Sequence, residues 1–372
     1  MPRFNIVKGS PVMRTVRVAQ MEGMFDCQPS ERSVESWHGE LPIDDWDWHI
    51  GLIIGPSGSG KSTLAREVFG DSVCNGFTWP EKESVLDGFP TEMSIKDITA
   101  LLSSVGFSSP PLWLRPFQVL STGQQMRVTV ARLLAENRSL AVMDEFTSVV
   151  DRTVAQISSA AIAKAVRQRG QRFVAVTCHY DVLDWLQPDW VYQPHTQEFL
   201  RREVQQRPPI ELEVKRVHHS CWPLFQPYHY LNHTFNKAAR CFVAFYQGQP
   251  VALQAVLAQP HPKARNLYRG HRAVCLPDYQ GVGIGNALIT HVASAYRALG
   301  NRILSTTASP ALNLSRTKDS RWKLLLAPHM CLPQGKTHSI GAWRTAFNRL
   351  TTTWEYIGPG MDVDQARGLL YG

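Results

Sequence analysis

The first half of the chain alternates short apolar runs with amphipathic stretches. The run at 50–54 has the length and composition of a buried strand, and residues 64–69 follow it with the pattern of a helix. Apolar runs at 140–143 and 174–177 predict two more buried strands, and residues 126–135 predict another helix. This succession of elements predicts an α/β fold for the first half.

The second half has its own succession of predicted strands and helices. Residues 210–217 alternate between apolar and polar side chains, as a half-buried strand does. Further strands are predicted at 241–246, 251–258, 273–276 and 302–307, helices at 223–236 and 286–298, and a turn at 247–250. A charged, proline-ended stretch at 201–209 separates the two patterns, so we predict domains over residues 1–205 and 206–372.

A glycine-rich turn joins the first predicted strand to its helix. Its sequence, Gly55-Pro56-Ser57-Gly58-Ser59-Gly60-Lys61-Ser62-Thr63, fits the phosphate-loop pattern G-x-x-x-x-G-K-[ST] at every position. Glycines let successive backbone N–H groups surround a polyphosphate, and the helix start adds partial positive charge. Lys61 would reach the terminal phosphates and Ser62 would hold a magnesium ion, so the turn predicts a nucleoside triphosphate site.

Three later segments carry groups that suit the same ligand. Ser121 and Gly123 open a predicted helix, where a hydroxyl and a backbone amide can hold an anion. Asp144 and Glu145 end an apolar strand; the first can order magnesium through water, and the second can polarise an attacking water. His179 ends another strand and can contact the terminal phosphate. Each segment is common alone, and only their order is informative.

In this order the motifs resemble those of the ATP-binding cassette (ABC) ATPases. The resemblance covers most of residues 1–200. It includes the signature Leu120-Ser121-Thr122-Gly123-Gln124, where Thr122 replaces a glycine, and Ser148-Val149-Val150-Asp151, which is like the family's aspartate loop. The family's usual glutamine between the phosphate loop and the signature is missing, and Asp87 stands in that region, so coupling to a partner is expected to differ from that of transporters.

The ABC resemblance implies a P-loop NTPase fold with ATP and Mg²⁺ as cofactors. The residues that it assigns are Glu145 and His179 for catalysis, Ser62 and Asp144 for the metal, and Ser121, Gly123 and Gln124 for nucleotide contact. The family also places the signature of one subunit on the ATP site of another, which implies a two-fold homodimer.

A second glycine-rich turn lies between a strand and a helix in the second half. Residues Gln280-Gly281-Val282-Gly283-Ile284-Gly285 offer free N–H groups at a helix start, which suits an anion. The turn resembles the pyrophosphate loop of the GNAT (Gcn5-related) N-acetyltransferases, whose pattern Q/R-x-x-G-x-G/A it meets. The resemblance covers about residues 210–360. It implies a GNAT-like mixed-sheet α+β fold, acetyl-CoA or another acyl-CoA as cofactor, and the amides of 280–285 as pyrophosphate ligands.

The sequence does not identify the acid of such a transferase. The family often has a tyrosine after the strand at 302–307, but this chain continues there with Ser309 to Arg316. Tyr279, Asp278, His271 and Tyr296 are the alternatives, and each suits a structural role equally well.

The charge of the chain is concentrated in its second half. Up to residue 205 there are 20 Lys and Arg against 24 Asp and Glu, and after it 19 against 7, so the net charges are −4 and +12. Such a bias is typical of a surface that binds a polyanion, although a solvated basic surface or a phosphorylated cofactor would also explain it. The run Arg316, Lys318, Arg321, Trp322 and Lys323 suits phosphate contacts with base stacking, or a solvated helix face.

Other features narrow the class of protein. Seven cysteines contain no C-x-x-C pair, which argues against a disulfide framework and a zinc ribbon. His229 and His233, near His218, His219 and Cys221, have a spacing compatible with a metal, although nucleic-acid contacts or a plain surface explain it better. Trp37, Trp46 and Trp48 are candidates to stack on adenine or to fill the core. No apolar run is long enough to span a membrane and no signal peptide is evident, so we expect a cytoplasmic protein.

The sequence therefore predicts an ABC-type ATPase fused to an acyl-CoA-dependent transferase that acts on a nucleic acid or a nucleic-acid-associated acceptor. Two alternatives remain open. The second domain can be a non-catalytic binding domain of an ATP-driven nucleic-acid-remodelling or regulatory factor, or the chain can be the ATPase subunit of a transporter.

Overall fold

The computed structural model describes residues 2–11, 13–25, 32–74, 76–136, 139–202, 207–230, 234–262, 264–329 and 351–372. The chain divides into two compact units, and each draws on separate stretches of sequence. The first unit comprises Met1–Phe77, Leu133–Val150 and Val166–Arg207, and the second comprises Thr78–Arg132, Asp151–Ala165 and Pro208–Gly372. The predicted boundary at residue 205 falls outside the described residues and stays a prediction.

The first unit is built on a six-stranded sheet in the order β4-β5-β6-β3-β7-β8. Its strands are β3 (Ile50–Ile54), β4 (Val73–Cys74), β5 (Leu140–Met143), β6 (Arg172–Thr177), β7 (Trp190–Gln193) and β8 (Glu198–Arg201). Neighbouring strands are parallel except that β8 runs antiparallel to β7. All five residues of β3 are buried because it lies between β6 and β7, which explains why its sequence is continuously apolar.

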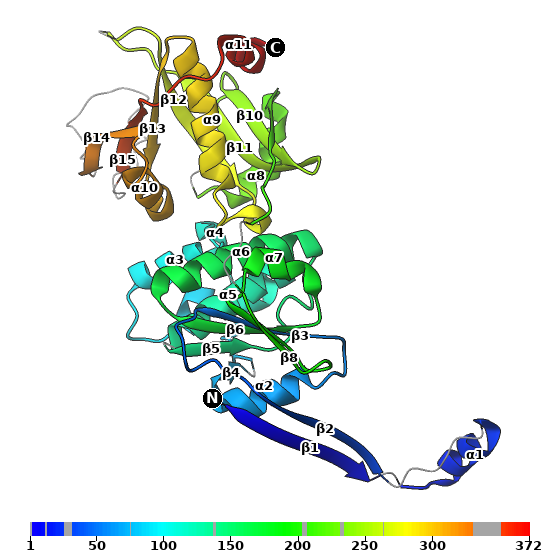
Figure 1. The fold of residues 1–372 in the computed structure, drawn as a ribbon. Helices are drawn as coiled ribbons and strands as arrows, with labels where there is room; N and C mark the ends of the chain where they lie inside the picture. The colour runs from blue at the N-terminus through cyan, green and yellow to red at the C-terminus, as the bar shows by residue number, and fades with distance from the viewer. Residues whose placement is uncertain are drawn as a thin grey trace. The chain divides into compact units, whose positions relative to one another are not determined.

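Helix α2 (Lys61–Phe69) covers one face of this sheet, as Figure 1 shows. Leu64 and Ala65 of α2 are completely buried and share one core with Ile53, Val142 and Val174 of the strands. The short helix α7 (Leu183–Leu186) follows β6 in the chain.

The N-terminal residues form a two-stranded antiparallel ribbon of β1 (Arg3–Pro11) and β2 (Arg32–Glu40), with helix α1 (Val16–Phe25) beyond its end (Figure 1). The alternating side chains of residues 15–18 predict a short strand from the sequence, and this prediction is wrong because α1 begins at Val16. The hydroxyl of Thr15 accepts a hydrogen bond from the N–H of Val18, which is the local capping that favours a helix start.

The second unit contains a seven-stranded sheet in the order β14-β15-β13-β12-β11-β10-β9. Its strands are β9 (Glu213–Val217), β10 (Arg240–Tyr246), β11 (Gln249–Ala258), β12 (Leu267–Cys275), β13 (Arg302–Thr307), β14 (Trp322–His329) and β15 (Thr351–Tyr356). All neighbours are antiparallel except β12 and β13. These two pair only over 267–269 and 302–304 and diverge beyond.

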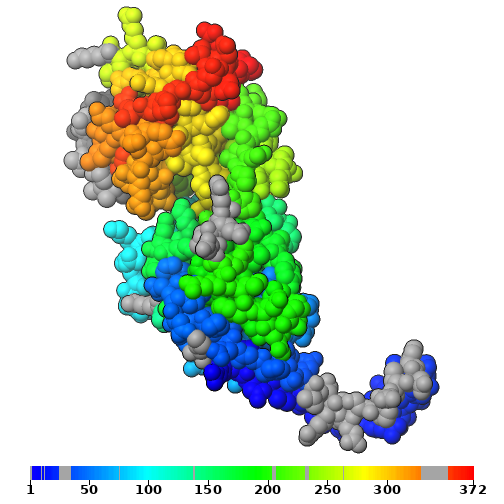
Figure 2. All heavy atoms as spheres, viewed as in Figure 1, coloured from blue at the N-terminus to red at the C-terminus, as the bar shows by residue number. Residues whose placement is uncertain are grey.

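Helix α9 (Ile284–Ala298) lies against this sheet and contributes a row of buried side chains to the core of the unit. Leu288, Val292 and Tyr296 are buried against Phe242 of β10 and Trp354 of β15. The C-terminal helix α11 (Val363–Tyr371) buries Ala366 and Leu370 in the same cluster. In Figure 2 this red segment lies beside the yellow residues of α9.

The remaining helices of the second unit come from separate stretches of sequence. They are α3 (Ile95–Ser104), α4 (Pro110–Trp113), α8 (Trp222–Phe225) and α10 (Pro310–Thr317), together with most of α5 (Thr122–Glu136) and α6 (Arg152–Arg169). The helix predicted over 223–236 is wrong for the described residues of that range, because α8 ends at Phe225 and a 3-10 turn over Gln226–Tyr228 follows it. Pro227 removes a helical N–H donor, and His229 is already extended (φ −89°, ψ 129°).

Candidate functional site

The phosphate-binding loop connects the buried end of β3 to the start of α2. Gly58 and Gly60 both have φ of +80°, a left-handed conformation that glycine adopts without a Cβ clash. The side chain of Lys61 is 8% exposed, and its Nζ donates a hydrogen bond of 2.7 Å to the carbonyl of Pro56. The lysine therefore folds back over the loop, where a phosphate oxygen could replace the carbonyl.

Two observations show that the loop fits a polyphosphate. The hydroxyl of Ser59 is buried and has no hydrogen-bond partner among the described residues, as expected for a group that would donate to a phosphate oxygen. A Cβ on Gly55 would lie 2.9 Å from that hydroxyl and 3.0 Å from Nδ1 of His195. The backbone at Gly55 is thus closely surrounded by polar atoms, and nothing in the sequence pattern pointed to His195.

Trp37 of β2 lies directly on the loop. Its Nε1 donates to the carbonyl of Ser59 at 3.1 Å, and a Cβ on Gly60 would lie only 2.2 Å from its ring. Trp48 is buried with its Nε1 bonded to the carbonyl of Ile43, and Trp46 lies beneath the guanidinium of Arg201. Of the three tryptophans named from the sequence, only Trp37 is thus placed on the phosphate loop.

A serine and a carboxylate with the chemistry of magnesium ligands meet beside the loop. The hydroxyl of Ser62 donates to Oδ1 of Asp144 at 3.0 Å, across 82 residues of sequence. The Asp144 side chain is 14% exposed and lies 3.9 Å from Arg66. Oxygen donors of this kind, at the start of α2 and the end of β5, fit the requirements of Mg²⁺.

Glu145 and His179 lie at the ends of neighbouring strands β5 and β6. Glu145 is exposed and adopts a left-handed conformation (φ 53°), which is uncommon for a residue other than glycine. Its Oε2 accepts a hydrogen bond from the hydroxyl of Ser148. His179 is half-buried, and its backbone N–H donates to the hydroxyl of Thr177. Both residues therefore lie at the carboxyl ends of the parallel strands, where the phosphate loop also begins.

The signature residues open α5 as predicted, but they have a structural role as well. The hydroxyl of Ser121 accepts from the N–H of Gln124, and Oε1 of Gln124 accepts from the N–H of Ser121, which is a reciprocal capping box. Ser121 is exposed, whereas Gly123 and Gln124 are buried. Asp87 caps a turn in a similar way, because its carboxylate accepts from the N–H and hydroxyl of Ser84.

The second glycine-rich turn divides into two parts. Gly283 has φ of +96°, caps α9, and has no atom within 4 Å of where a Cβ would lie, so its surroundings are open. Gln280 instead uses its N–H on the carbonyl of Pro277 and its side chain on Ser108, Ser109 and Cys275. Val282 lies between these parts, and Ile284 and Gly285 begin the helix. The predicted anion cradle is therefore open over residues 283–285 and closed at Gln280.

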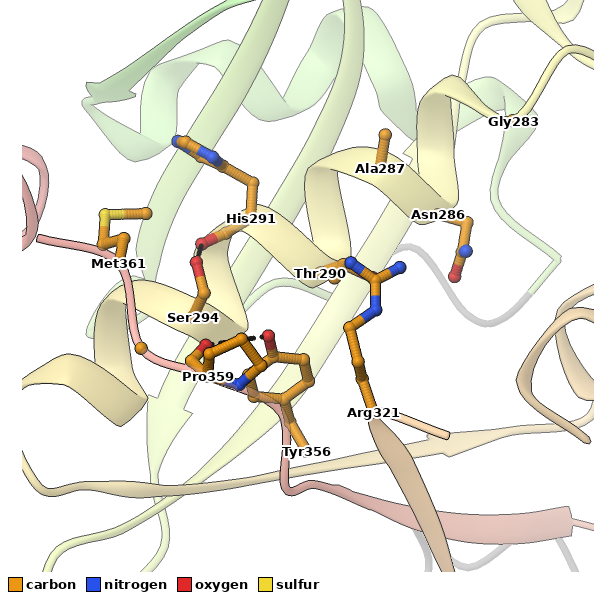
Figure 3. Close-up of a pocket in the computed structure, with 11 residues that line it drawn as sticks. Gly283, Asn286, Ala287, Thr290, His291, Ser294, Arg321, Tyr356, Pro359 and Met361 are labelled. Atoms are coloured by element: carbon orange, nitrogen blue, oxygen red, sulfur yellow. Dashed lines mark hydrogen bonds between the residues drawn. The ribbon is translucent and has the colours of Figure 1, made fainter. Parts of the chain in front are cut away.

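A cavity of about 510 Å³ begins at this open part and follows α9, as Figure 3 shows. Gly283, Asn286, Thr290 and His291 line it from α9, and Arg321 and the segment 356–361 line it from the other side. Its volume is that of a site for a cofactor-sized molecule. Arg321 pairs with both carboxylate oxygens of Asp319 at 2.9 Å, so a guanidinium is held at the cavity wall.

The residues named as alternatives for the transferase acid are not equally suited. Tyr296 is completely buried in the core, and burial raises its pKa to about 12. Burial and the neighbouring Arg272 and Arg269 lower the pKa of His271 to about 4, so this histidine is a neutral imidazole at pH 7 and a poor general acid. Burial raises the pKa of Tyr279, and Asp278 lies 3.9 Å from Arg127. Cys275, whose pKa burial raises to about 12, is a protonated thiol.

The basic run and the histidines have different surroundings from those that the sequence suggested. Arg316 is 1% exposed and stacks on Trp322, so it belongs to the interior and does not offer a charge to solvent. Lys318, Arg321 and Lys323 remain exposed.

His229 is buried beside Trp222, His233 lies outside the described residues, and no cluster of three metal-ligating side chains occurs among the residues described. In the part of the chain that the structure covers, no helix has the length and apolar character needed to cross a membrane.

Comparison with known proteins finds two kinds of similarity in the chain. Residues 180–316 match the model of the acetyltransferase (GNAT) family. The chain is 26% identical over 162 residues to the Fe(3+) ions import ATP-binding protein FbpC of Pseudomonas fluorescens, a match that covers 34% of the chain and 46% of that protein. It is 24% identical over 118 residues to the ribosome protection protein VmlR of Bacillus subtilis, covering 27% and 21%.

Among solved structures, cbiO1 from Clostridium perfringens, part of the ABC transporter complex cbiONQ, matches 41% of this chain and 75% of its own. The identity is 17% and the TM-score is 0.34. The matches span less than half the length of the two curated relatives.

The phosphate loop on a mostly parallel sheet and the mixed sheet with α9 define a P-loop NTPase fold followed by a GNAT-like fold, which confirms the predicted fold class. Residues 180–316 are thus similar to the GNAT acetyltransferase family, and 34% of the chain is similar to an ABC transporter ATP-binding protein of Synechocystis, at 29% identity.

Proposed function

We propose that this protein is an ATP-hydrolysing cassette ATPase fused to an acetyl-CoA-dependent acyltransferase whose acceptor is a nucleic acid or a nucleic-acid-associated group. The observation that carries the proposal is a glycine-rich turn at the start of each of two helices, at Lys61 of α2 and at Ile284 of α9. The first site fits a triphosphate, and the second opens into a cavity of cofactor size.

In the ATPase, each group has a role that follows from its chemistry. The backbone N–H groups of residues 57–60 and Nζ of Lys61 bind the phosphates, and Ser62 and Asp144 would hold Mg²⁺, which would neutralise charge on the phosphate oxygens. Glu145 orients and polarises the attacking water, and His179 contacts the terminal phosphate. Thr63 follows in the first turn of α2. The signature residues Ser121, Gly123 and Gln124 complete the site of a second copy, so we expect a two-fold homodimer.

In the transferase, the amides around Gly283 and Gly285 bind the pyrophosphate of acyl-CoA. Arg321 faces the same cavity and supplies a cation for a further phosphate of the cofactor. The acceptor amine attacks the thioester carbonyl, so a C–N bond forms and the C–S bond breaks. The amine loses a proton to a base, and the leaving group is the thiolate of CoA.

The basic second half supports a nucleic-acid acceptor. Residues after 205 carry a net charge of +12, far more than one acyl-CoA needs. A ribosome protection protein is also among the relatives of the ATPase region, and ribosomes are rich in nucleic acid.

The proposal is tested by incubating the full-length protein with radiolabelled acetyl-CoA, ATP and either DNA, RNA or a basic protein. Label is expected in a nucleic-acid fraction in the presence of ATP, and Lys61→Ala is expected to abolish the ATP dependence. Label only in protein would overturn the nucleic-acid acceptor, and no label with intact ATPase activity would overturn the transferase.

Gly283→Ala and Gly300→Ala form a matched pair for the cofactor site. Both glycines have positive φ (96° and 71°) and no atom within 4 Å of the position that a Cβ would take, so both variants carry similar backbone strain. Only Gly283 lies at the proposed pyrophosphate site. We expect Gly283→Ala to weaken CoA binding at least about tenfold and Gly300→Ala to leave it unchanged; equal effects would argue against this site.

A second candidate function is an ATP-driven remodelling factor in which the GNAT-like region only binds. The hydrogen bond from Gln280 to Ser109 closes that end of the loop, which favours this function. The raised pKa of Tyr296 and the lowered pKa of His271 make both poor general acids, which favours it as well. Failure to bind CoA, with nucleic-acid-stimulated ATP hydrolysis, would select this function. The names of relatives such as FbpC keep a transporter ATPase as a third candidate, which co-purification with a membrane protein would select.

A further inference from the structure

The turn that leads into the proposed acyl-CoA loop is held by the helix that begins at the ABC signature. Arg127 of α5 is completely buried, and Nη1 and Nη2 donate to the carbonyls of Pro277 and Asp278, the latter at 2.9 Å. Its Nε donates to the hydroxyl of Ser158 on α6 at 2.8 Å. One guanidinium thus joins two helices of the ATPase sequence to a turn about 150 residues further along the chain.

A second contact holds the first residues of the loop itself. The N–H of Ser108 donates to Oε1 of Gln280 at 2.6 Å, and Nε2 of Gln280 donates to the hydroxyl of Ser109 at 2.9 Å. Gly106 and Gly281 are packed so closely that a Cβ on Gly281 would lie 2.8 Å from Cα of Gly106. The loop is therefore fixed at Gln280 and Gly281 and open at Gly283.

The surroundings of Arg127 indicate that this contact is specific. Burial lowers the pKa of Arg127 to about 10, which shows that its charge is held at a cost. Three hydrogen bonds and the carboxylate of Asp278, 3.9 Å away, offset that cost. A plain packing contact between two regions would place an apolar side chain here.

We propose that nucleotide binding regulates the acyl-CoA site through Arg127 and the Gln280 contact. Ser121 caps α5 and Arg127 lies six residues further on, roughly 9 Å along the helix axis. A nucleotide held at the signature therefore contacts the same helix whose Arg127 holds the turn before the loop. This inference rests on the proposed function. Holding α5 lowers the entropy that the loop loses when it binds pyrophosphate, so nucleotide tightens acyl-CoA binding.

The test measures the Kd of CoA by calorimetry on the full-length protein, with and without a non-hydrolysable ATP analogue and Mg²⁺. We expect the analogue to tighten CoA binding at least about fivefold, the lower end of ordinary allosteric coupling. Saturating CoA is expected to tighten the analogue by the same factor, because linkage is reciprocal.

Two variants and a control locate the coupling. Arg127→Met and the milder Ser109→Ala are expected to reduce the ratio of Kd values towards one while each ligand still binds alone. Ser109→Ala keeps the test valid where Arg127→Met does not fold. Arg132→Met is the matched control, because Arg132 is on the same helix but bonds to Thr78 and stacks on Trp79, away from the loop.

The outcomes separate the regulation from the function on which it rests. CoA that binds equally with and without the analogue overturns the regulation and leaves the transferase proposal intact. Coupling that survives in both variants overturns the role of these contacts. No CoA binding under any condition overturns the proposed transferase and the regulation together.

Discussion

Among the described residues of the second unit, Arg127 and Arg316 are completely buried, and their surroundings differ. Arg127 has three hydrogen bonds and a nearby carboxylate. Arg316 stacks on Trp322 and donates one hydrogen bond to Ser305, while its Nε and Nη1 have no partner among the described residues. Burial lowers the pKa of both to about 10. Arg316 is thus a buried cation with little compensation, next to the strand β13 that diverges from β12.

We expect Arg316→Met to raise the free energy of unfolding by about 1–3 kcal/mol. Burial disfavours the charged form, so the unfolded chain binds the proton more tightly and the charge destabilises the fold at pH 7. Urea unfolding at pH 7 measures the change, with the exposed Arg367→Met as the control. A loss of stability would show that the hydrogen bond to Ser305 and the contact with Trp322 outweigh the desolvation.

His271 gives a prediction about pH. Its pKa is lowered from 6.5 to about 4, and its Nε2 accepts a hydrogen bond from the N–H of Asn236. Because the unfolded chain takes up the proton first, the contribution of this neutral histidine to stability is complete above pH 6.5 and is lost as the pH falls towards 4.

The pH dependence is checked by NMR titration of His271 and by urea unfolding of the wild type and His271→Gln. The wild type is expected to lose more stability than the variant between pH 6.5 and 4. A His271 titration midpoint near 6.5 in the folded protein would contradict the prediction.

At the scale of elements, the phosphate loop depends on the ribbon of β1 and β2 as well as on β3 and α2. Trp37 of β2 occupies the space where a Cβ of Gly60 would lie. Gly58 has the same φ of +80° but nothing within 4 Å of that position. Substituting alanine at each of the two glycines therefore distinguishes the cost of backbone strain from the cost of the clash with Trp37.

We expect Gly58→Ala to cost about 1–2 kcal/mol from left-handed strain alone. Gly60→Ala is expected to cost about 1–3 kcal/mol more, because Trp37 must move, and to weaken ATP-analogue binding more strongly than Gly58→Ala does. Thermal unfolding and nucleotide titration measure both effects. If Trp37→Ala in the Gly60→Ala background restores no stability, the clash is not the cause.

At the scale of the whole molecule, the charge asymmetry predicts salt-sensitive binding of nucleic acid. A surface with excess Lys and Arg releases counterions from phosphates, so the logarithm of the binding constant falls linearly with the logarithm of salt concentration. We expect at least about a tenfold loss of affinity for DNA or RNA between 50 and 200 mM salt. Fluorescence anisotropy with the full-length protein measures it, and affinity that does not change with salt would contradict a phosphate-binding surface.

Much of the fold could be predicted because the informative signals are local. The strand at 302–307 and the continuous apolar residues of β3 are predicted by neighbouring side chains alone. The helix over 223–236 failed because Pro227 interrupts it, and residues 15–18 were misassigned because helix-forming residues after them outweighed two valines. The conformation of a residue depends on the helix and strand preferences of its neighbours as well as its own. A pattern of four residues does not include those neighbours.

The sequence by itself determined the two glycine-rich turns, their order with Asp144, Glu145 and His179, and the basic second half, because these depend on residue type and spacing. Only the tertiary structure decided that Ser62 meets Asp144, that Arg316 faces inward, and that Gln280 is bound to Ser108 and Ser109. These contacts join residues 11 to 172 positions apart, and their energies depend on burial and packing, which no local pattern contains.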